Sequence, residues 1–206
     1  LLQAPAVEVG TPLRIRLAAP TGKAAARLTE SISQQVLSLK VPESVRERIP
    51  TQVTTVHRLL GSRPGTRHFR HHLGNPLPLD VLVVDEASMI DLEMMANLLD
   101  ALPPHARLVL LGDKDQLASV EAGAVLGDLC RDAEAGFYSA ETRQWLQAVS
   151  GEDLSASGLQ EDLDGSHPLA QQVVMLRYSR RFGEGSGIGQ LARWVNQQNA
   201  EEARQL

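Results

Sequence analysis

The chain has 206 residues, of which 43% are hydrophobic and 22% are charged, a composition that is ordinary for a globular protein. Its formal net charge of −5 argues against a protein that holds nucleic acid by bulk positive charge, but it does not exclude a local basic groove. No apolar run approaches the ~20 residues that a membrane-spanning helix needs. Cys130 is the only cysteine, so no internal disulfide is expected and a cytoplasmic location fits.

Aliphatic runs alternate with helical periodicity along the chain. The run at 13–19 predicts a first strand, and the apolar residues from Ala25 to Leu39 recur at the spacing of one helix face. The runs at 81–84 and 108–111 predict two further strands. Because these two are almost purely aliphatic, we expect both of their faces to be covered.

Between the last two strands, Asp91 is predicted to cap a helix, and Pro103-Pro104 to end it. The expected apolar face of this helix is Leu92, Met95, Leu99 and Leu102. Further along the chain, the patterns predict a strand at 173–176 and helices at 122–133, 141–149 and 188–198.

Strands that alternate with helices indicate βαβ units, and therefore an α/β fold with a parallel sheet. Two stretches interrupt the alternation. Residues 62–79 are rich in Gly, Pro, Arg and His and predict a small hairpin or excursion with a solvated basic patch. Residues 151–167 are rich in Gly, Ser, Asp and Glu and predict a flexible surface loop.

Polar residues follow three of the predicted strands. In an open parallel sheet, ligands bind beyond the carboxyl ends of the strands, which lie at one edge. A single polar strand end often only caps a helix, whereas three together favour a binding site. The three segments are Pro20-Thr21-Gly22-Lys23, Asp85-Glu86-Ala87-Ser88 and Gly112-Asp113-Lys114-Asp115-Gln116.

The adjacent carboxylates of Asp85 and Glu86 are the sharpest chemical signal. One carboxylate is enough to hold Mg²⁺ beside phosphates, since this ion prefers oxygen ligands and keeps several waters. The other carboxylate could orient or deprotonate an attacking water. Taken alone, the pair fits equally well a capping aspartate followed by a solvated glutamate.

The other segments are less specific. Gln116 suits the sensing of a terminal phosphate, but a polar turn is the commoner interpretation of its segment. Residues 20–23 lack the G-x-x-x-x-G-K-[ST] pattern of an ATP-cradling loop. Thr21 and Lys23 could instead hold a nucleic-acid phosphate, or the segment could be a simple turn. Residues 55–61 look like a capped short helix, in which His57 is by itself an ordinary surface residue.

Taken in order, the segments resemble the motifs of superfamily 1 DNA helicases of the 5′-to-3′ class. The RecD family, the alpha subunits of exonuclease V (RecBCD), is the most similar. Residues 17–28 resemble motif Ia, 55–60 motif Ib, 83–89 motif II (the Walker B box), 111–117 motif III and 176–182 motif IV.

The resemblance implies a RecA-like P-loop NTPase domain that translocates along single-stranded DNA in double-strand break repair and recombination. It implies ATP and Mg²⁺ as cofactors, and single-stranded DNA and the RecB and RecC subunits as partners. Residues 1–176 would belong to the first motor domain and 177–206 to the junction with the second. Asp85 would bind Mg²⁺, Glu86 would activate water, Gln116 and Arg181 (or its neighbour Arg180) would sense the γ-phosphate, and Pro20, Thr21, Lys23, Thr55 and His57 would contact DNA.

The chain departs from the family pattern at both ends. The glycine-rich P-loop should precede motif Ia, and nothing before Leu13 supplies it, while motifs V and VI should lie beyond Leu206. We therefore expect this piece alone to hydrolyse ATP negligibly and to expose a sheet edge where a strand is missing. The alternative function is a non-catalytic DNA-binding or subunit-docking module with a motor fold.

Overall fold

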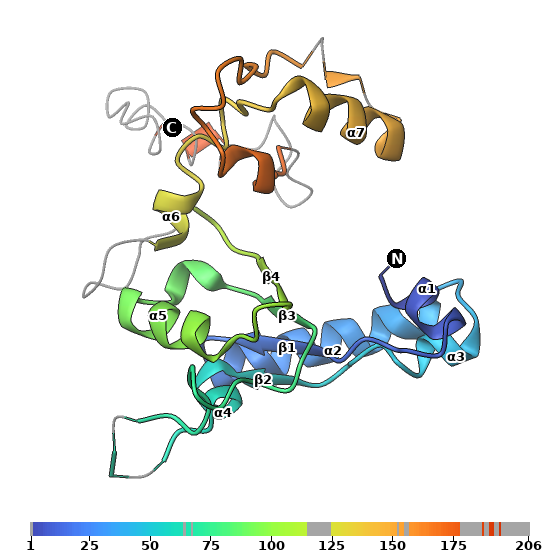
Figure 1. Cartoon of the computed structure of the whole chain (residues 1–206), viewed down its shortest axis with the longest axis vertical. Coiled ribbons are helices and arrows are strands. Elements are labelled where there is room, and N and C mark those ends of the chain that lie inside the picture. The colour runs from blue at the N-terminus through green and yellow to red at the C-terminus, as the bar shows by residue number, and fades with distance from the viewer. Residues whose placement is uncertain are drawn as a thin grey trace. The chain divides into compact units, whose positions relative to one another are not determined.

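The computed structural model describes residues 2–63, 65–66, 68–114, 125–151, 153–154 and 157–177, and the single positions 187, 190, 191 and 194. The chain divides into two compact units, Leu1–Asp128 and Leu129–Leu206. The elements (Figure 1) are, in chain order, α1 (Gln3–Glu8), β1 (Ile15–Ala19), α2 (Gly22–Ser38), α3 (Glu43–Arg46), β2 (Val53–Thr55), α4 (Val56–Leu60), β3 (Val81–Val84), the 3₁₀ helix η1 (Ala87–Met89), α5 (Leu92–Ala101), β4 (Arg107–Leu110), α6 (Val125–Leu129), α7 (Ala140–Ser150) and the 3₁₀ helix η3 (Ala170–Gln172).

The strands of the first unit form one parallel sheet in the order β2-β1-β3-β4. Helices connect successive strands and flank the sheet (Figure 1). The predicted α/β fold with a parallel sheet is therefore confirmed. The largest fully buried side chains come from β3 of this sheet and from segments of the first unit: Val56, Leu60, Leu79, Leu82, Val84 and Leu98. In the described part of the chain, no helix is both long and apolar enough to span a bilayer.

The predicted strands at 13–19, 81–84 and 108–111 correspond to β1, β3 and β4, with shifts of at most two residues. β3 is buried between its two neighbours, as its aliphatic sequence predicts. The same expectation is wrong for β4, where Val109 is 39% exposed and the following Leu111 is 47% exposed. β4 lies at the edge of the described sheet. The aliphatic composition of β3 and β4 is similar, so composition alone did not show that β4 is the more exposed strand.

The capped helix after β3 begins as predicted, because the Asp91 side chain accepts a hydrogen bond from the Met94 N–H at 2.7 Å. Its buried face is different. Met95, Leu98 and Ala101 face the core, whereas Leu92 is 64% and Leu99 is 53% exposed. Apolar residues occur on more than one side of α5, so the helical spacing did not define which side packs.

β2 is the strand that the sequence analysis missed. It contains only Val53, Thr54 and Thr55, and Thr55 is also the N-cap residue of α4. A three-residue strand gives almost no periodic signal, and the predicted short helix at 55–61 absorbed its last residue. Its pairing with β1 is long-range and not visible in the local sequence.

In the segment predicted as a small hairpin, the described residues make two isolated antiparallel bridges, Ser62 with Phe69 and His72 with Asn75. The side chain of His57, from the preceding helix, contacts the ring of Phe69 edge-on, with ring centroids 6.1 Å apart. This excursion belongs to the first unit and returns to the sheet at Leu77 and Leu79, which are buried.

The elements from α6 onward differ more from the prediction. Helix α7 lies within a residue of the predicted range, but α6 ends at Leu129, four residues before the predicted helix does. The strand predicted at 173–176 is wrong, since these residues pair with no strand in the described part of the chain and Leu176 is 90% exposed. The helix predicted at 188–198 lies largely outside the described residues.

The loop predicted at 151–167 is anchored at one described residue. Asp162 is buried, and its carboxylate accepts hydrogen bonds from the backbone N–H groups of Ser166 and His167. The flexibility of the loop and the domain boundary at 176/177 stay predictions, and the division into compact units falls elsewhere, after Asp128.

Candidate functional site

The carboxyl ends of all four strands lie at the same edge of the sheet, because every pairing is parallel. Thr55 ends β2 and is the register partner of Ala19, the last residue of β1. On the other side of β1, the Asp85 N–H donates to the Ala18 carbonyl at 3.0 Å. The Leu111 N–H in turn donates to the Val84 carbonyl at 2.8 Å. Neighbouring strands thus deliver the predicted site segments side by side.

Two of the predicted DNA-contacting residues, Thr21 and Thr55, are helix N-caps. The Thr21 hydroxyl accepts from the Ala24 N–H at the start of α2, and the Thr55 hydroxyl accepts from the Arg58 N–H at the start of α4, each at 3.2 Å. A capping hydroxyl still has its own hydrogen to donate. Both side chains are therefore held in place while each keeps a donor for a ligand.

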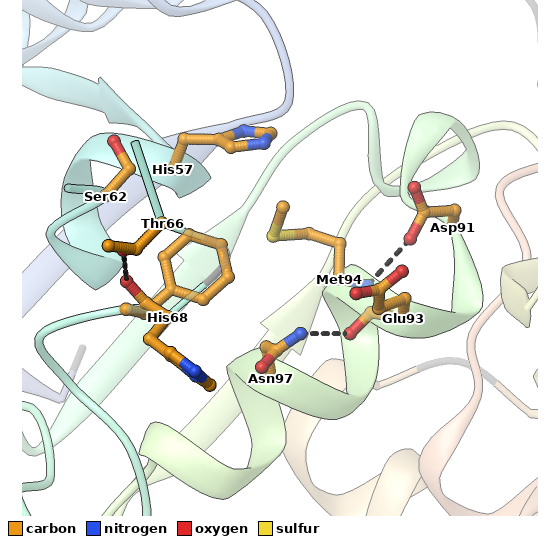
Figure 2. A pocket seen from close by; sticks show the side chains of 9 residues that line it. His57, Ser62, Thr66, His68, Asp91, Glu93, Met94 and Asn97 are labelled. Atoms are coloured by element: carbon orange, nitrogen blue, oxygen red, sulfur yellow. Dashed lines mark hydrogen bonds between the residues drawn. The ribbon is translucent and has the colours of Figure 1, made fainter. Parts of the chain in front are cut away.

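The other predicted DNA-contacting residues surround these caps. Pro20 is half-buried and leads from β1 into α2, and Lys23 is exposed in the first turn of α2. His57 is exposed on α4 and lines a cleft that the excursion and the start of α5 form with it (Figure 2). The five residues proposed for DNA contact thus belong to the two strand-to-helix connections at the β1 and β2 end of the edge.

Asp85 and Glu86 follow β3, and both are half-buried. Among the described residues, neither carboxylate makes a hydrogen bond or an ion pair with another side chain. Glu86 has a left-handed backbone conformation, with φ 53° and ψ 37°, which is uncommon for a residue other than glycine. This conformation ends the strand abruptly and starts the 3₁₀ helix η1.

Gly112 connects the segment after β4 to this pair of acids. The Ala87 N–H donates to the Leu111 carbonyl at 2.8 Å, which brings the two connections together. A Cβ atom on Gly112 would lie 3.1 Å from the backbone nitrogens of Ala87 and Ser88 and 2.7 Å from the Leu126 side chain. The glycine is thus required by close packing.

The predicted phosphate sensors cannot be placed. Gln116 and Arg181, together with the alternative Arg180, lie outside the described residues. Lys114 is the last described residue before Gln116. Arg177 is described, and its guanidinium donates to the carbonyls of Ala133 and Glu134 at 3.1 and 2.7 Å within the second unit. This favours a packing role for Arg177.

A group of potential metal ligands in the second unit was not predicted. Asp162, Asp164 and His167 place one ligand atom each within 4.8 Å of one another. Hydrogen bonds from the side chain and the backbone N–H of Ser166 to Asp164 lower the pKa of that carboxyl, and the His167 ring stacks on Phe137 at 3.9 Å. Asp162 is satisfied by backbone donors, so these contacts account for the group as a hydrogen-bonded turn.

Comparison with known proteins agrees with the α/β fold of the first unit. Residues 3–122, which contain the whole sheet, match the family model described as an AAA domain. The chain belongs to this AAA domain family. This family membership covers all of the predicted site residues except Arg181.

The chain is also similar to curated proteins of the RecD type, which confirms the resemblance inferred from the motifs. It is 45% identical over 198 residues to the RecBCD enzyme subunit RecD of Haemophilus influenzae, covering 94% of this chain and 30% of that protein. It is 42% identical over 215 residues to the RecBCD enzyme subunit RecD of Mycolicibacterium smegmatis, covering 100% of this chain and 35% of that protein.

A shorter match joins the chain to the ATP-dependent RecD2 DNA helicase of Deinococcus radiodurans, with 43% identity over 121 residues, 59% of this chain and 14% of that protein. The chain spans about a third of the length of the RecD relatives described above, which it covers to 30% and 35%.

Proposed function

We propose that this chain is part of an ATP-dependent 5′-to-3′ single-stranded DNA translocase and helicase, the alpha subunit of an exonuclease V. Its relatives named RecBCD enzyme subunit RecD support this assignment, as does the relative named ATP-dependent RecD2 DNA helicase. The partners would be single-stranded DNA and the RecB and RecC subunits, and the work would be double-strand break repair and recombination in the cytoplasm. Residues 1–176 would form part of the first motor domain and 177–206 the junction with the second.

The observation that carries the proposal is the meeting of four polar segments at one edge of a parallel sheet. Thr55 ends β2, and Thr21, Asp85 and Gly112 come after β1, β3 and β4; this is the order of the strands across the sheet. Hydroxyl and cationic groups therefore gather at one end of the edge and carboxylates near the other. Such a division suits a protein that moves along a polyanion bound at one end and hydrolyses a phosphate-containing ligand bound at the other.

At the acidic end, the half-buried carboxylates of Asp85 and Glu86 fit a magnesium–nucleotide complex, because they are oxygen ligands that make no ion pair among the described residues. Mg²⁺ would neutralise charge on the phosphates when bound. Asp85 would hold the ion. Glu86 would accept a proton from the attacking water, and Gln116 and Arg181 would sense the γ-phosphate.

At the other end, Thr21, Lys23 and the N-terminus of the 17-residue helix α2 can meet a DNA phosphate. Thr55 and His57 offer a hydroxyl and a ring nitrogen beside them, and Pro20 shapes the connection. These groups recognise the backbone and carry no base information. They therefore suit a motor that moves along any sequence.

The decisive experiment replaces Glu86 in the full-length protein. Glu86→Gln removes the proton acceptor and preserves the size of the side chain, so DNA-stimulated ATP hydrolysis should fall by at least about 100-fold. Binding of a fluorescent ATP analogue should stay within about threefold of the unsubstituted protein. Glu30→Gln, at an exposed position of α2, is the matched control and should hydrolyse ATP normally.

The rival function, a non-catalytic module with a motor fold, gives a different result. A full-length protein that binds single-stranded DNA but neither binds nor hydrolyses ATP would support the rival. If Glu86→Gln hydrolysed ATP as fast as the Glu30→Gln control, the role assigned to Glu86 would be wrong, although another residue could still catalyse hydrolysis. The two measurements on one pair of variants separate these outcomes.

A further inference from the structure

A cleft of about 430 Å³ lies beside the predicted DNA track, within the first unit (Figure 2). This volume lies within the usual range for small-ligand pockets, about 300 to 1,000 Å³. One wall comes from His57 on α4 and from the excursion that follows it, and the other comes from the first turns of α5. The lining residues are His57, Ser62, Thr66, His68, Phe69, Asp91, Glu93, Met94 and Asn97.

The apolar groups of the cleft suit a flat ligand. Phe69 is half-buried, and its contact with His57 is edge-on, with an interplanar angle of 64°. Met94, also half-buried, comes from the opposite wall. Aromatic rings in proteins that bind single strands stack on bases whatever the sequence, since every base has an aromatic face.

The polar groups on the α5 wall are mainly acceptors. Asp91 Oδ1 already accepts from the Met94 N–H, and Asn97 Nδ2 donates to the Glu93 carbonyl at 2.8 Å (Figure 2). What remains for a ligand is the exposed Glu93 carboxylate, the second oxygen of Asp91 and the Asn97 amide oxygen. Two carboxylates at this wall repel a phosphate, so the group that enters must carry no negative charge and must donate hydrogens.

We infer that this cleft receives an unpaired nucleobase that carries an exocyclic amino group. The base stacks on Phe69, and its amino group donates to Glu93 and Asn97. The strand's phosphates stay outside, along Thr55 and His57. Cytosine presents such an amino group and thymine does not. The inference rests on the proposed single-strand binding and adds a base preference to it.

The test measures the affinity of the full-length protein for fluorescein-labelled oligo-dC and oligo-dT of equal length, by fluorescence anisotropy at one fixed salt concentration. We expect oligo-dC to bind about five- to tenfold tighter. Glu93→Gln should reduce that ratio to near one, because an amide donates to thymine as well as accepting from cytosine. Phe69→Leu should weaken both oligonucleotides by about tenfold and leave their ratio unchanged.

Controls separate recognition from folding. Glu93 is exposed, so the Glu93→Gln substitution should hardly change the melting temperature. Glu30→Gln is the charge control, because it removes a charge of the same sign from outside the cleft. Equal affinities for oligo-dC and oligo-dT in the unsubstituted protein, or a ratio that Glu93→Gln leaves unchanged, would overturn the inference. The second result would point to a basic protein segment as the occupant. No binding of either oligonucleotide would instead overturn the proposed function.

Discussion

Glu86 has a backbone conformation that its side chain does not favour. A left-handed residue other than glycine costs roughly 1–2 kcal/mol, and such strain persists mainly where function requires the geometry. Here it ends β3 and sets the start of η1 against Gly112. Glutamine shares the backbone preferences of glutamate, so Glu86→Gln tests the carboxylate without altering the strain.

Asp80 is a second residue whose environment was not visible in the sequence. Its carboxylate accepts three hydrogen bonds from Arg14, one from the backbone N–H at 2.8 Å and two from the guanidinium at 3.0 and 2.7 Å. These bonds hold the pKa of Asp80 well below its usual value of 3.8, and His105 lies 3.2 Å from the same carboxylate. The cluster fixes the amino ends of β1 and β3.

This pKa shift predicts a pH-dependent loss of stability in Asp80→Asn. A carboxylate whose folded pKa is depressed stabilises the fold above its unfolded pKa, and the contribution disappears as the pH falls toward the folded pKa. The unsubstituted protein should therefore resist urea better than Asp80→Asn at about pH 7, and the difference should shrink below about pH 4. The exposed Asp100→Asn is the control and should show little difference at either pH. A difference that stays constant from about pH 7 to about pH 3 would refute the prediction.

Local chemistry made some residues predictable. Asp91 was identified as a cap, and residues 55–61 as a capped short helix, because each signal lies within a few residues, and Gly61 ends α4 with φ 74° as a C-terminal glycine should. The Arg14–Asp80 cluster was not predictable, since the partners are 66 residues apart and only the β1–β3 pairing brings them together.

At the scale of elements, substitutions of the helix caps Thr21 and Thr55 can separate their structural role in capping from their proposed role in DNA contact. Aspartate caps a helix as well as threonine does, so Thr21→Asp and Thr55→Asp should retain their melting temperatures. Each adds a negative charge where a phosphate is expected. Two like charges 4 Å apart in water repel by about 1 kcal/mol, which predicts about fivefold weaker single-strand binding by the full-length protein.

A matched control for the cap substitutions is Ser139→Asp. Ser139 caps α7 in the same way, accepting from the Thr142 N–H at 3.2 Å, but it belongs to the second unit and to no proposed DNA contact. Its DNA affinity should match that of the unsubstituted protein. Equal effects of all three substitutions would mean that only the net charge of the protein matters, and would remove Thr21 and Thr55 from the site.

The close approach of two connections predicts a large cost for a single methyl group. Gly112→Ala places a Cβ against the backbone nitrogens of Ala87 and Ser88, which cannot move without disturbing η1. Overpacking of this kind destabilises by about 1–3 kcal/mol. Gly22→Ala is the control, because a Cβ there meets no atom within 4 Å and lies in a helix. Urea titration that gives the same unfolding free energy for both variants would contradict this packing argument.

The bounds of an element were predictable where its local sequence fits only one kind of secondary structure. β3 matches its predicted range because four aliphatic residues are followed by two acids. The face of α5 and the cover of β4 were wrong because each depends on neighbours distant in sequence. The strand at 173–176 was wrong for a related reason: Val174 and Leu176 are aliphatic, yet no described strand lies beside them.

For the whole molecule, the main difference between the two units is how many large apolar side chains each one buries. All of the largest fully buried side chains belong to the first unit. In the described part of the second unit, the buried apolar residues are Ala133, Tyr138 and Ala170, and large apolar side chains such as Leu163 and Leu176 are 87% and 90% exposed. Less apolar burial means less stabilisation, so the second unit should open at a lower free energy.

The positions of the two tryptophans make this difference measurable in the 206-residue chain. Trp145 and Trp194 both belong to the second unit, so tryptophan fluorescence reports on that unit alone, whereas far-UV circular dichroism reports on both. If the units differ by about 2 kcal/mol and each loses about 2 kcal/mol of stability per molar urea, the fluorescence midpoint should precede the dichroism midpoint by about 1 M. Amide hydrogen exchange should be slowest in β1 and β3 and faster in α7. Coincident midpoints with equal protection in β3 and α7 would mean that the chain unfolds as one cooperative body, and that the exposed apolar side chains of the second unit are stabilised by contacts other than its own core.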